Sequence, residues 1–71
     1  MHLSVGSISK REVEVLQLIA QEYTINEIAD QLCLSYHTIV SHRKNILSKL
    51  QARNTAGLVR RGFELGILNL S

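Results

Sequence analysis

The stretch that decides the fold runs from Thr24 to His42 and reads TINEIADQLCLSYHTIVSH. It holds two aliphatic patterns at helical spacing, one over residues 25–32 and one from residue 36 onward. Thr24 and Ser35 each precede a pattern, and their hydroxyl oxygens can accept a hydrogen bond from a free amide of the first helical turn. A short helix, a tight turn and a longer helix form a helix-turn-helix, which this stretch therefore predicts.

The chain on either side adds one further helix. Ser9 and Glu12 have the spacing of a capping box, and aliphatic residues recur after them. Asn54 is a cap for a last helix, which we expect to end near Gly66. We therefore predict an all-α four-helix bundle containing a helix-turn-helix, with helices over about residues 10–21, 25–32, 36–51 and 55–66.

Length and composition fit one small domain. The chain has 71 residues, of which 45% are hydrophobic and only 4% aromatic, so its core must be aliphatic. Residues 1–7 lack helical periodicity and are predicted to be a linker or a disordered N-terminus, which leaves residues 8–71 as the domain.

The single Cys excludes an intramolecular disulfide, and no apolar run approaches the ~20 residues of a membrane span. We expect a cytoplasmic protein without membrane contact.

Helical spacing assigns an inward stripe to each predicted helix. The expected inward residues are Ile8, Val15, Leu16, Ile19 and Tyr23; Ile25, Ile28, Ala29 and Leu32; Ile39, Ile46, Leu47 and Leu50; and Ala56, Val59, Phe63 and Ile67. In the last helix, Leu58 and Leu65 fall outside this stripe. They are either plain exposed aliphatics or part of a contact with a second copy.

Charge is distributed unevenly. Residues 31–63 hold six Lys or Arg and no Asp or Glu, whereas residues 1–30 hold five acidic residues and two basic ones. Such asymmetry favours a polyanionic partner, although an ordinary solvated basic face would look similar.

A helical wheel of residues 36–51 sharpens this inference. Opposite Ile39 lie His37, Ser41, Lys44 and Ser48, with Val40 on one edge and Thr38, His42, Asn45 and Lys49 on the other. This outer face mixes donors, acceptors and a cation and has no acid, which suits the base edges of a DNA major groove. Its second edge has donors spaced to hold a phosphate strand. The alternative is a polar face turned to solvent.

Three segments together resemble a known family. They comprise Ser9, Arg11, Glu12, Glu14, Val15 and Leu16; Glu27, Ile28, Ala29, Leu32, Leu34, Ser35, Thr38, Ile39 and His42; and Lys49, Leu50, Arg53 and Asn54. In this order and spacing they resemble the LuxR-type (NarL/FixJ-type) DNA-binding domain of bacterial transcriptional regulators. The resemblance covers about residues 8–67. It implies an output domain, expected from a two-component response regulator, controlled by an N-terminal receiver or ligand-sensing domain and open to contact with RNA polymerase.

The resemblance also implies roles for individual residues. Base contacts fall on Val40, Ser41 and Lys44, and phosphate contacts on Thr24, Thr38, His42 and Lys49; His37 and Ser48 complete the predicted DNA-binding set. The helix over residues 55–66 is expected to form a homodimer on DNA through Leu58, Arg61 and Leu65. The expected target is an imperfect inverted repeat of double-stranded DNA.

Two positions depart from the family pattern. Glu22 stands where the family usually has Gly after its first helix, so this helix is expected to end differently or under strain. Val40 stands where Lys is frequent, and it can offer only apolar contact, for example to a thymine methyl.

Other functions are weaker alternatives. A sigma-factor-like promoter-reading domain shares parts of the pattern but has no use for the fourth helix. A helical protein-interaction module would need an apolar patch on the third helix, which the wheel lacks.

We expect no enzyme and no cofactor or metal, because His37 and His42 lack partner ligands nearby in sequence. Cys33 is predicted to be a small turn residue packed partly inside.

Overall fold

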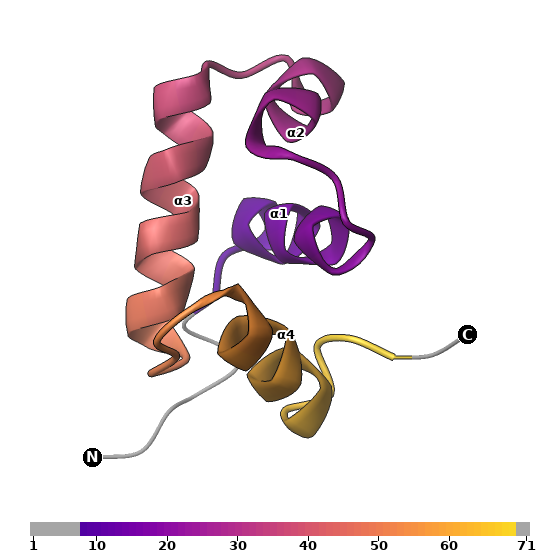
Figure 1. The fold of residues 1–71 in the computed structure, drawn as a ribbon, viewed down its shortest axis with the longest axis vertical. Helices are drawn as coiled ribbons and strands as arrows, with labels where there is room; N and C mark the ends of the chain where they lie inside the picture. Colours follow the sequence, from indigo (N-terminus) through magenta and orange to yellow (C-terminus); the bar gives the residue numbers. More distant parts are fainter. Residues whose placement is uncertain (1–7, 70–71) are drawn as a thin grey trace.

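The computed structural model describes residues 8–69. Within this range lie four helices and no strand: α1 (Lys10–Ala20), α2 (Ile25–Leu32), α3 (Tyr36–Lys49) and α4 (Thr55–Glu64). Helix α3 stands along one side of the molecule and packs against the other three (Figure 1). The predicted all-α bundle with a helix-turn-helix is confirmed. The linker predicted over residues 1–7 lies outside the described residues.

All four helices begin where their caps predict. The side chains of Ser9, Thr24, Ser35 and Asn54 each accept a hydrogen bond from the backbone N–H three residues on, at 3.0–3.2 Å. In α1 and α2 the third residue is a glutamate whose carboxylate accepts the N–H of the cap in return. Each cap therefore satisfies amides that a helix start leaves without a partner.

All four helices also end alike, with one residue in the left-handed region. These residues are Glu22 (φ 69°), Cys33 (φ 57°), Gln51 (φ 54°) and Gly66 (φ 77°). The next amide reaches back over the last turn: Tyr23 N–H, for example, donates to the Leu18 carbonyl at 3.1 Å. This Schellman ending favours Gly, so Glu22 holds the strained conformation expected of it. Because of these left-handed residues, α1, α3 and α4 end one or two residues before their predicted ends.

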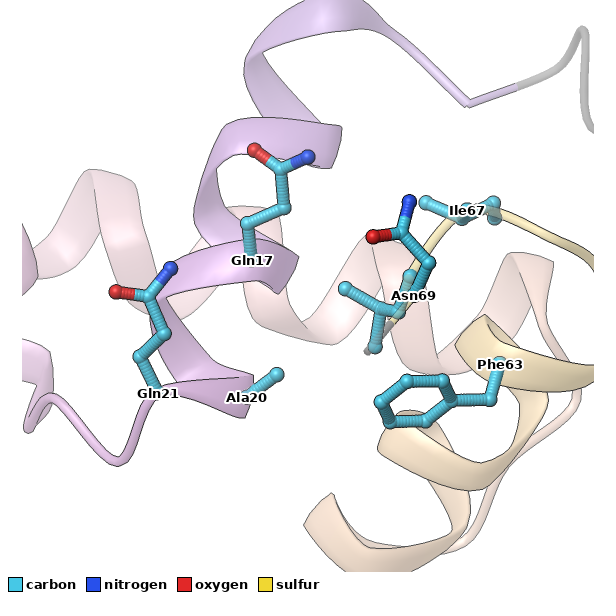
Figure 2. A pocket seen from close by; sticks show the side chains of 7 residues that line it. Gln17, Ala20, Gln21, Phe63, Ile67 and Asn69 are labelled. Carbon is cyan, nitrogen blue, oxygen red and sulfur yellow. The ribbon is translucent and has the colours of Figure 1, made fainter. Parts of the chain in front are cut away.

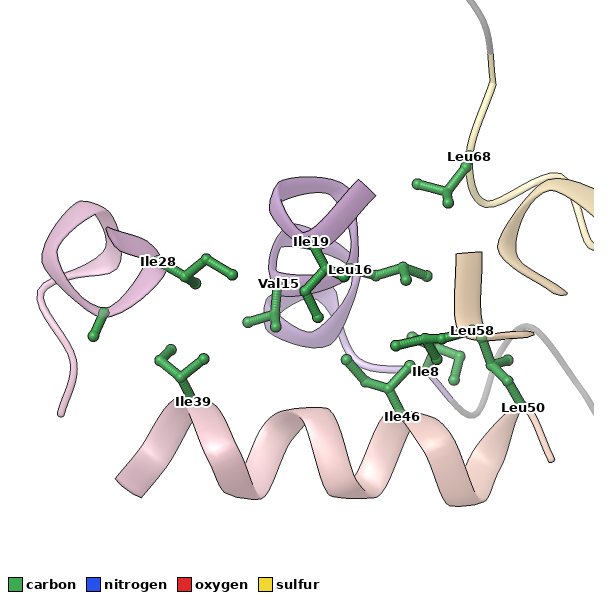
Figure 3. Close-up of a cluster of buried hydrophobic side chains, with 11 residues drawn as sticks. Ile8, Val15, Leu16, Ile19, Ile28, Ile39, Ile46, Leu50, Leu58 and Leu68 are labelled. Atoms are coloured by element: carbon green, nitrogen blue, oxygen red, sulfur yellow. The ribbon is translucent and has the colours of Figure 1, made fainter. Parts of the chain in front are cut away.

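The core is aliphatic and centred on α1. Figure 3 shows Val15, Leu16 and Ile19 of α1 between Ile28 of α2 on one side and Leu58 of α4 on the other. Ile39 and Ile46 point into the same cluster from α3 and are fully buried. The core stripes predicted for the first three helices are thus confirmed, except that Tyr23 is 37% exposed.

The inward stripe predicted for α4 is only partly correct, because Val59 and Ile67 pack against the core but Ala56 and Phe63 do not. Leu58 is 0% exposed and Gly62 is buried, whereas Phe63 is 40% exposed and Ala56 is exposed. A Cβ atom at Gly62 would lie 2.7 Å from the Leu68 side chain, so any larger residue here would have to displace Leu68. The buried Gly62 therefore lies on the inward face of α4. Leu58, one turn earlier, shares this face, and Phe63 does not.

Candidate nucleic-acid interface

The outer face of α3 is polar and open. His37, Ser41, Lys44 and Ser48 are all exposed, and we call these four residues the reading face. They project from the side of α3 opposite Ile39 and Ile46, which are locked into the core. Thr38, Val40 and His42 are partly exposed beside them. The structure thus brings seven of the nine predicted DNA-binding residues onto one surface.

The start of α3 adds hydroxyl and aromatic groups to this surface. The Ser35 and Thr38 hydroxyls are 2.8 Å apart, so the Thr38 side chain is held in one position. Tyr36, the first residue of α3, is 50% exposed, and its ring meets that of His37 edge to face at 6.2 Å. Tyr36 was not among the predicted DNA-binding residues, because a position three residues before Ile39 falls toward the inward side of the wheel.

Thr24 lies apart from α3, at the start of α2. Its hydroxyl accepts the Glu27 N–H at 3.2 Å, and its own N–H donates to the Glu27 carboxylate at 2.8 Å. A phosphate at this helix start would therefore meet an acidic side chain. Thr24 is exposed, but its polar groups already have partners.

Lys49, predicted to contact phosphate, forms an ion pair within the domain. Its ammonium donates to the Glu12 carboxylate at 2.7 Å, and the Glu12 side chain is only 5% exposed. Burial raises the pKa of Glu12, but the hydrogen bonds from Lys49 and from the Ser9 amide outweigh it, so this pKa is lower than usual. The ammonium thus compensates a buried charge and links the start of α1 to the end of α3.

Most other cations of the acid-free stretch are also engaged. Arg43 donates to the Thr55 hydroxyl at 2.6 Å. Arg61 donates to the Leu50 carbonyl at 3.2 Å, and both Arg60 and Arg61 pair with Glu64. Among the six cations of residues 31–63, Lys44 and Arg53 alone show no hydrogen bond or ion pair to the described part of the chain.

Arg53 is a candidate that the sequence analysis missed. It is exposed in the turn after α3, two residues beyond Gln51. Two sequence signals pointed to it: Arg53 lies in the acid-free stretch, and it belongs to the Lys49–Asn54 segment of the family resemblance.

The predicted dimer residues need correction. Leu58 is completely buried and cannot contact a second copy. Leu65 is partly buried against the same core, and Arg61 is tied to α3. Cys33, predicted to be partly inside, is exposed because its left-handed backbone turns it out of the helix-turn-helix.

The described residues offer little for small-molecule chemistry. One cleft, of about 440 Å³, lies between α1 and α4 and is shown in Figure 2, where Phe63 points toward Ala20 below the amides of Gln17 and Gln21. It contains no titratable side chain. No group of three His, Cys, Asp or Glu that could hold a metal occurs within residues 8–69.

The short α2, the left-handed turn at Cys33 and the exposed, acid-free face of α3 define a helix-turn-helix of the DNA-binding class. Comparison with known proteins identifies the family. The model for bacterial regulatory proteins of the luxR family matches residues 6–61. The chain belongs to this family of transcription regulators and forms its helix-turn-helix DNA-binding domain.

Individual relatives agree with this assignment. The chain is 37% identical over 67 residues to the uncharacterized response regulatory protein YgeK of Escherichia coli K12, and covers 46% of it. It is 37% identical over 62 residues to the oxygen regulatory protein NreC of Staphylococcus carnosus, of which it covers 29%. These matches take in 94% and 87% of this chain, so it spans less than half of either relative.

A solved structure of the transcription factor GerE superposes with a TM-score of 0.83 at 30% identity. The superposition covers 89% of this chain and 94% of that one. No helix within residues 8–69 is long and apolar enough to span a membrane.

Proposed function

We propose that this domain reads a specific sequence of double-stranded DNA by placing α3 in the major groove, as the output domain of a bacterial transcriptional regulator. The observation that carries the proposal is the reading face, which is exposed, free of acid and fixed in orientation by the buried Ile39 and Ile46. A rigid helix with such a face fits the width of the major groove and the donor and acceptor pattern displayed there.

Within this proposal, base and phosphate contacts divide by position. Ser41 and Lys44 meet base edges at the centre of the reading face, and Val40 adds apolar contact at its rim. His37 and Ser48 extend the same face toward its two ends. Lys44 carries the largest share of base discrimination, because it is the only cation of this face.

Phosphate contacts are proposed around the reading face. Thr38 and His42 lie along its second edge, and Arg53 follows its far end. Thr24 contributes only if a phosphate displaces the Glu27 carboxylate from its amide. These groups fix the register of the domain on the duplex without selecting its sequence.

The assembly is proposed to be a homodimer on an imperfect inverted repeat, with contacts through α4. Two copies would place their α3 helices in successive major grooves, about 34 Å apart. The relatives named as response regulatory and oxygen regulatory proteins support a two-component output domain joined to an N-terminal receiver or sensing domain. Such a regulator acts in the cytoplasm, contacts RNA polymerase and catalyses no reaction.

Selection of random duplexes by the purified chain tests the proposal. We expect enrichment of an inverted repeat and binding that weakens steeply with salt. The Lys44→Ala variant should relax base preference at one position in each half-site, whereas Arg53→Gln should weaken binding to all duplexes alike. No enriched sequence and no binding at ~50 mM salt would instead favour a protein-interaction module.

A further inference from the structure

Tyr36 and His37, the first two residues of α3, form an aromatic pair on the surface of the domain. Their ring centroids lie 6.2 Å apart, and the ring planes are nearly perpendicular, at 87°. Aromatic rings favour this edge-to-face geometry because the positive edge of one ring meets the negative face of the other. Both residues are exposed, Tyr36 by 50%. The contact therefore orders two surface side chains and does not complete the core.

The backbone that carries this pair is fixed. Ser35 Oγ accepts the Thr38 N–H at 3.1 Å, and the two hydroxyls are 2.8 Å apart. The next residue, Ile39, is fully buried. The freedom that remains at the start of α3 is thus the rotation of exposed side chains about their own bonds. The Tyr36 ring restricts this rotation for His37, because only some rotamers keep the two rings in contact.

His37 has the groups needed to read a base edge. One ring nitrogen of a neutral imidazole donates a hydrogen bond and the other accepts one. Within residues 8–69 neither nitrogen has a hydrogen-bond partner, and the side chain is exposed on the reading face. Purines present their N7 acceptor in the major groove, where an imidazole N–H can donate to it. A side chain that is restricted before binding loses less rotational freedom on binding, which favours this contact.

We propose that Tyr36 is a positioning residue, which holds the His37 ring for donation to a purine N7 at the end of the half-site that the start of α3 reaches. Tyr36 lies toward the inward side of the wheel, one turn before Val40, so its own ring flanks the base edges. It acts on specificity through His37. This inference rests on the proposed reading of DNA by α3 and adds to it a residue that determines the preference at one further base pair.

The ring contact is tested first in the purified chain without DNA. Tyr36→Ala should shift the proton resonances of the His37 ring, because it removes the ring current of its neighbour. Tyr36→Phe keeps the ring and should leave these resonances nearly unchanged. Thermal unfolding should be nearly unaffected in both variants, since the pair lies outside the core. His37 resonances that do not respond to Tyr36→Ala would overturn the proposal.

Binding to selected duplexes that differ at a single base pair tests the consequence for specificity. The base pair whose preference is lost in His37→Ala is the one that His37 reads, and a 7-deaza purine there should weaken binding of the unchanged chain but not of His37→Ala. Tyr36→Ala should reduce discrimination at this base pair about threefold to tenfold and leave the preference read by Lys44 intact. Tyr36→Phe should retain the discrimination. Tyr23→Ala, at a tyrosine 37% exposed before α2, is the matched control and should change neither preference.

The double variant Y36A/H37A decides whether Tyr36 acts through His37. If it does, loss of Tyr36 has no further effect on discrimination once His37 is absent. Equal losses from Tyr36→Ala with and without His37 would overturn the proposal, because Tyr36 would then contact DNA by itself. Unchanged base preference in His37→Ala would overturn it as well. Failure of the unchanged chain to select any duplex would instead contradict the proposed DNA-binding function, and with it the basis of this inference.

Discussion

Helix α3 carries two lysines in its second half, Lys44 and Lys49, and they have different partners. Lys44 projects from the middle of the helix into solvent and forms no hydrogen bond or ion pair within residues 8–69, whereas Lys49 at the end binds the buried Glu12 carboxylate. In sequence both belong to one acid-free basic stretch. The comparison teaches that a cation is available to DNA only if the fold leaves it unpaired.

The largest effect is expected from a change in the buried side of α3, which holds both lysines in place. Ile39→Asp would place an unpaired carboxylate where α3 meets α1 and α2, at a cost of several kcal/mol. A domain of this size has about 5–10 kcal/mol of total stability at most, so we expect an unfolded or severely destabilised chain. Loss of the helical far-UV circular dichroism signal would confirm this. An unchanged melting temperature would place Ile39 at the surface and contradict the orientation of α3.

Leu58→Glu tests the corrected orientation of α4 and should be nearly as severe. If Leu58 faces the core, this change buries a charge and costs about 3–5 kcal/mol. Phe63→Glu on the exposed side is the control and should leave the free energy of unfolding within about 1 kcal/mol of the original. Urea denaturation of both variants measures the difference. A stable Leu58→Glu chain would return Leu58 to the dimer surface.

Lys44→Ala and Lys49→Met should separate binding from folding. Lys44→Ala should cost about 1–3 kcal/mol in DNA binding and leave stability unchanged. Lys49→Met should cost about 1–2 kcal/mol in stability, because it leaves the Glu12 charge with only the Ser9 amide, and should not alter base preference. Thermal melts and titrations of one selected duplex measure both quantities. An altered base preference in Lys49→Met would mean that the end of α3 also reads DNA.

The Glu12–Lys49 pair should make stability depend on pH. Because the pKa of Glu12 is lowered in the folded chain, its contribution is present at neutral pH and is lost as the pH falls through this lowered pKa. Denaturation midpoints measured from pH 7 to pH 3 should therefore fall less steeply for Glu12→Gln than for the unchanged chain. Parallel curves for the two chains would contradict the role given to this pair.

The smallest effect is expected at the end of α1. Glu22→Gly should stabilise the chain by about 0.5 kcal/mol, because Gly adopts the left-handed conformation without the strain that Glu22 bears. Gln17→Gly, within α1, is the opposite case and should destabilise by about 1 kcal/mol. DNA affinity should not change in either, since both positions lie off the reading face.

Much of the fold could be predicted because helix starts depend on nearby side chains. Ser9, Thr24, Ser35 and Asn54 act within three residues of themselves, so their sequence neighbours identify them. The predicted helix ends were less accurate. Gly is the usual sequence signal of a left-handed helix end, and three of the four left-handed residues are not Gly. The outer face of α3 was placed correctly because one regular helix period determines it.

The errors came from contacts between distant parts of the chain. Lys49 finds its partner 37 residues away, and no local pattern shows this. In α4 the two alternative stripes are both apolar, and the decisive feature is that Gly62 must admit Leu68. That requirement becomes visible only when the segment after α4 packs back on the core.

The salt dependence of half-site binding tests the central claim most directly. The logarithm of the binding constant of one protomer should fall linearly with the logarithm of the salt concentration, and each lost phosphate contact should reduce the slope by about 0.9. We predict that Arg53→Gln reduces the slope by about this amount, while Lys49→Gln leaves it unchanged at a temperature where that variant is folded. A reduced slope for Lys49→Gln with no change for Arg53→Gln would contradict the account, because the paired cation and not the free one would then be holding the DNA.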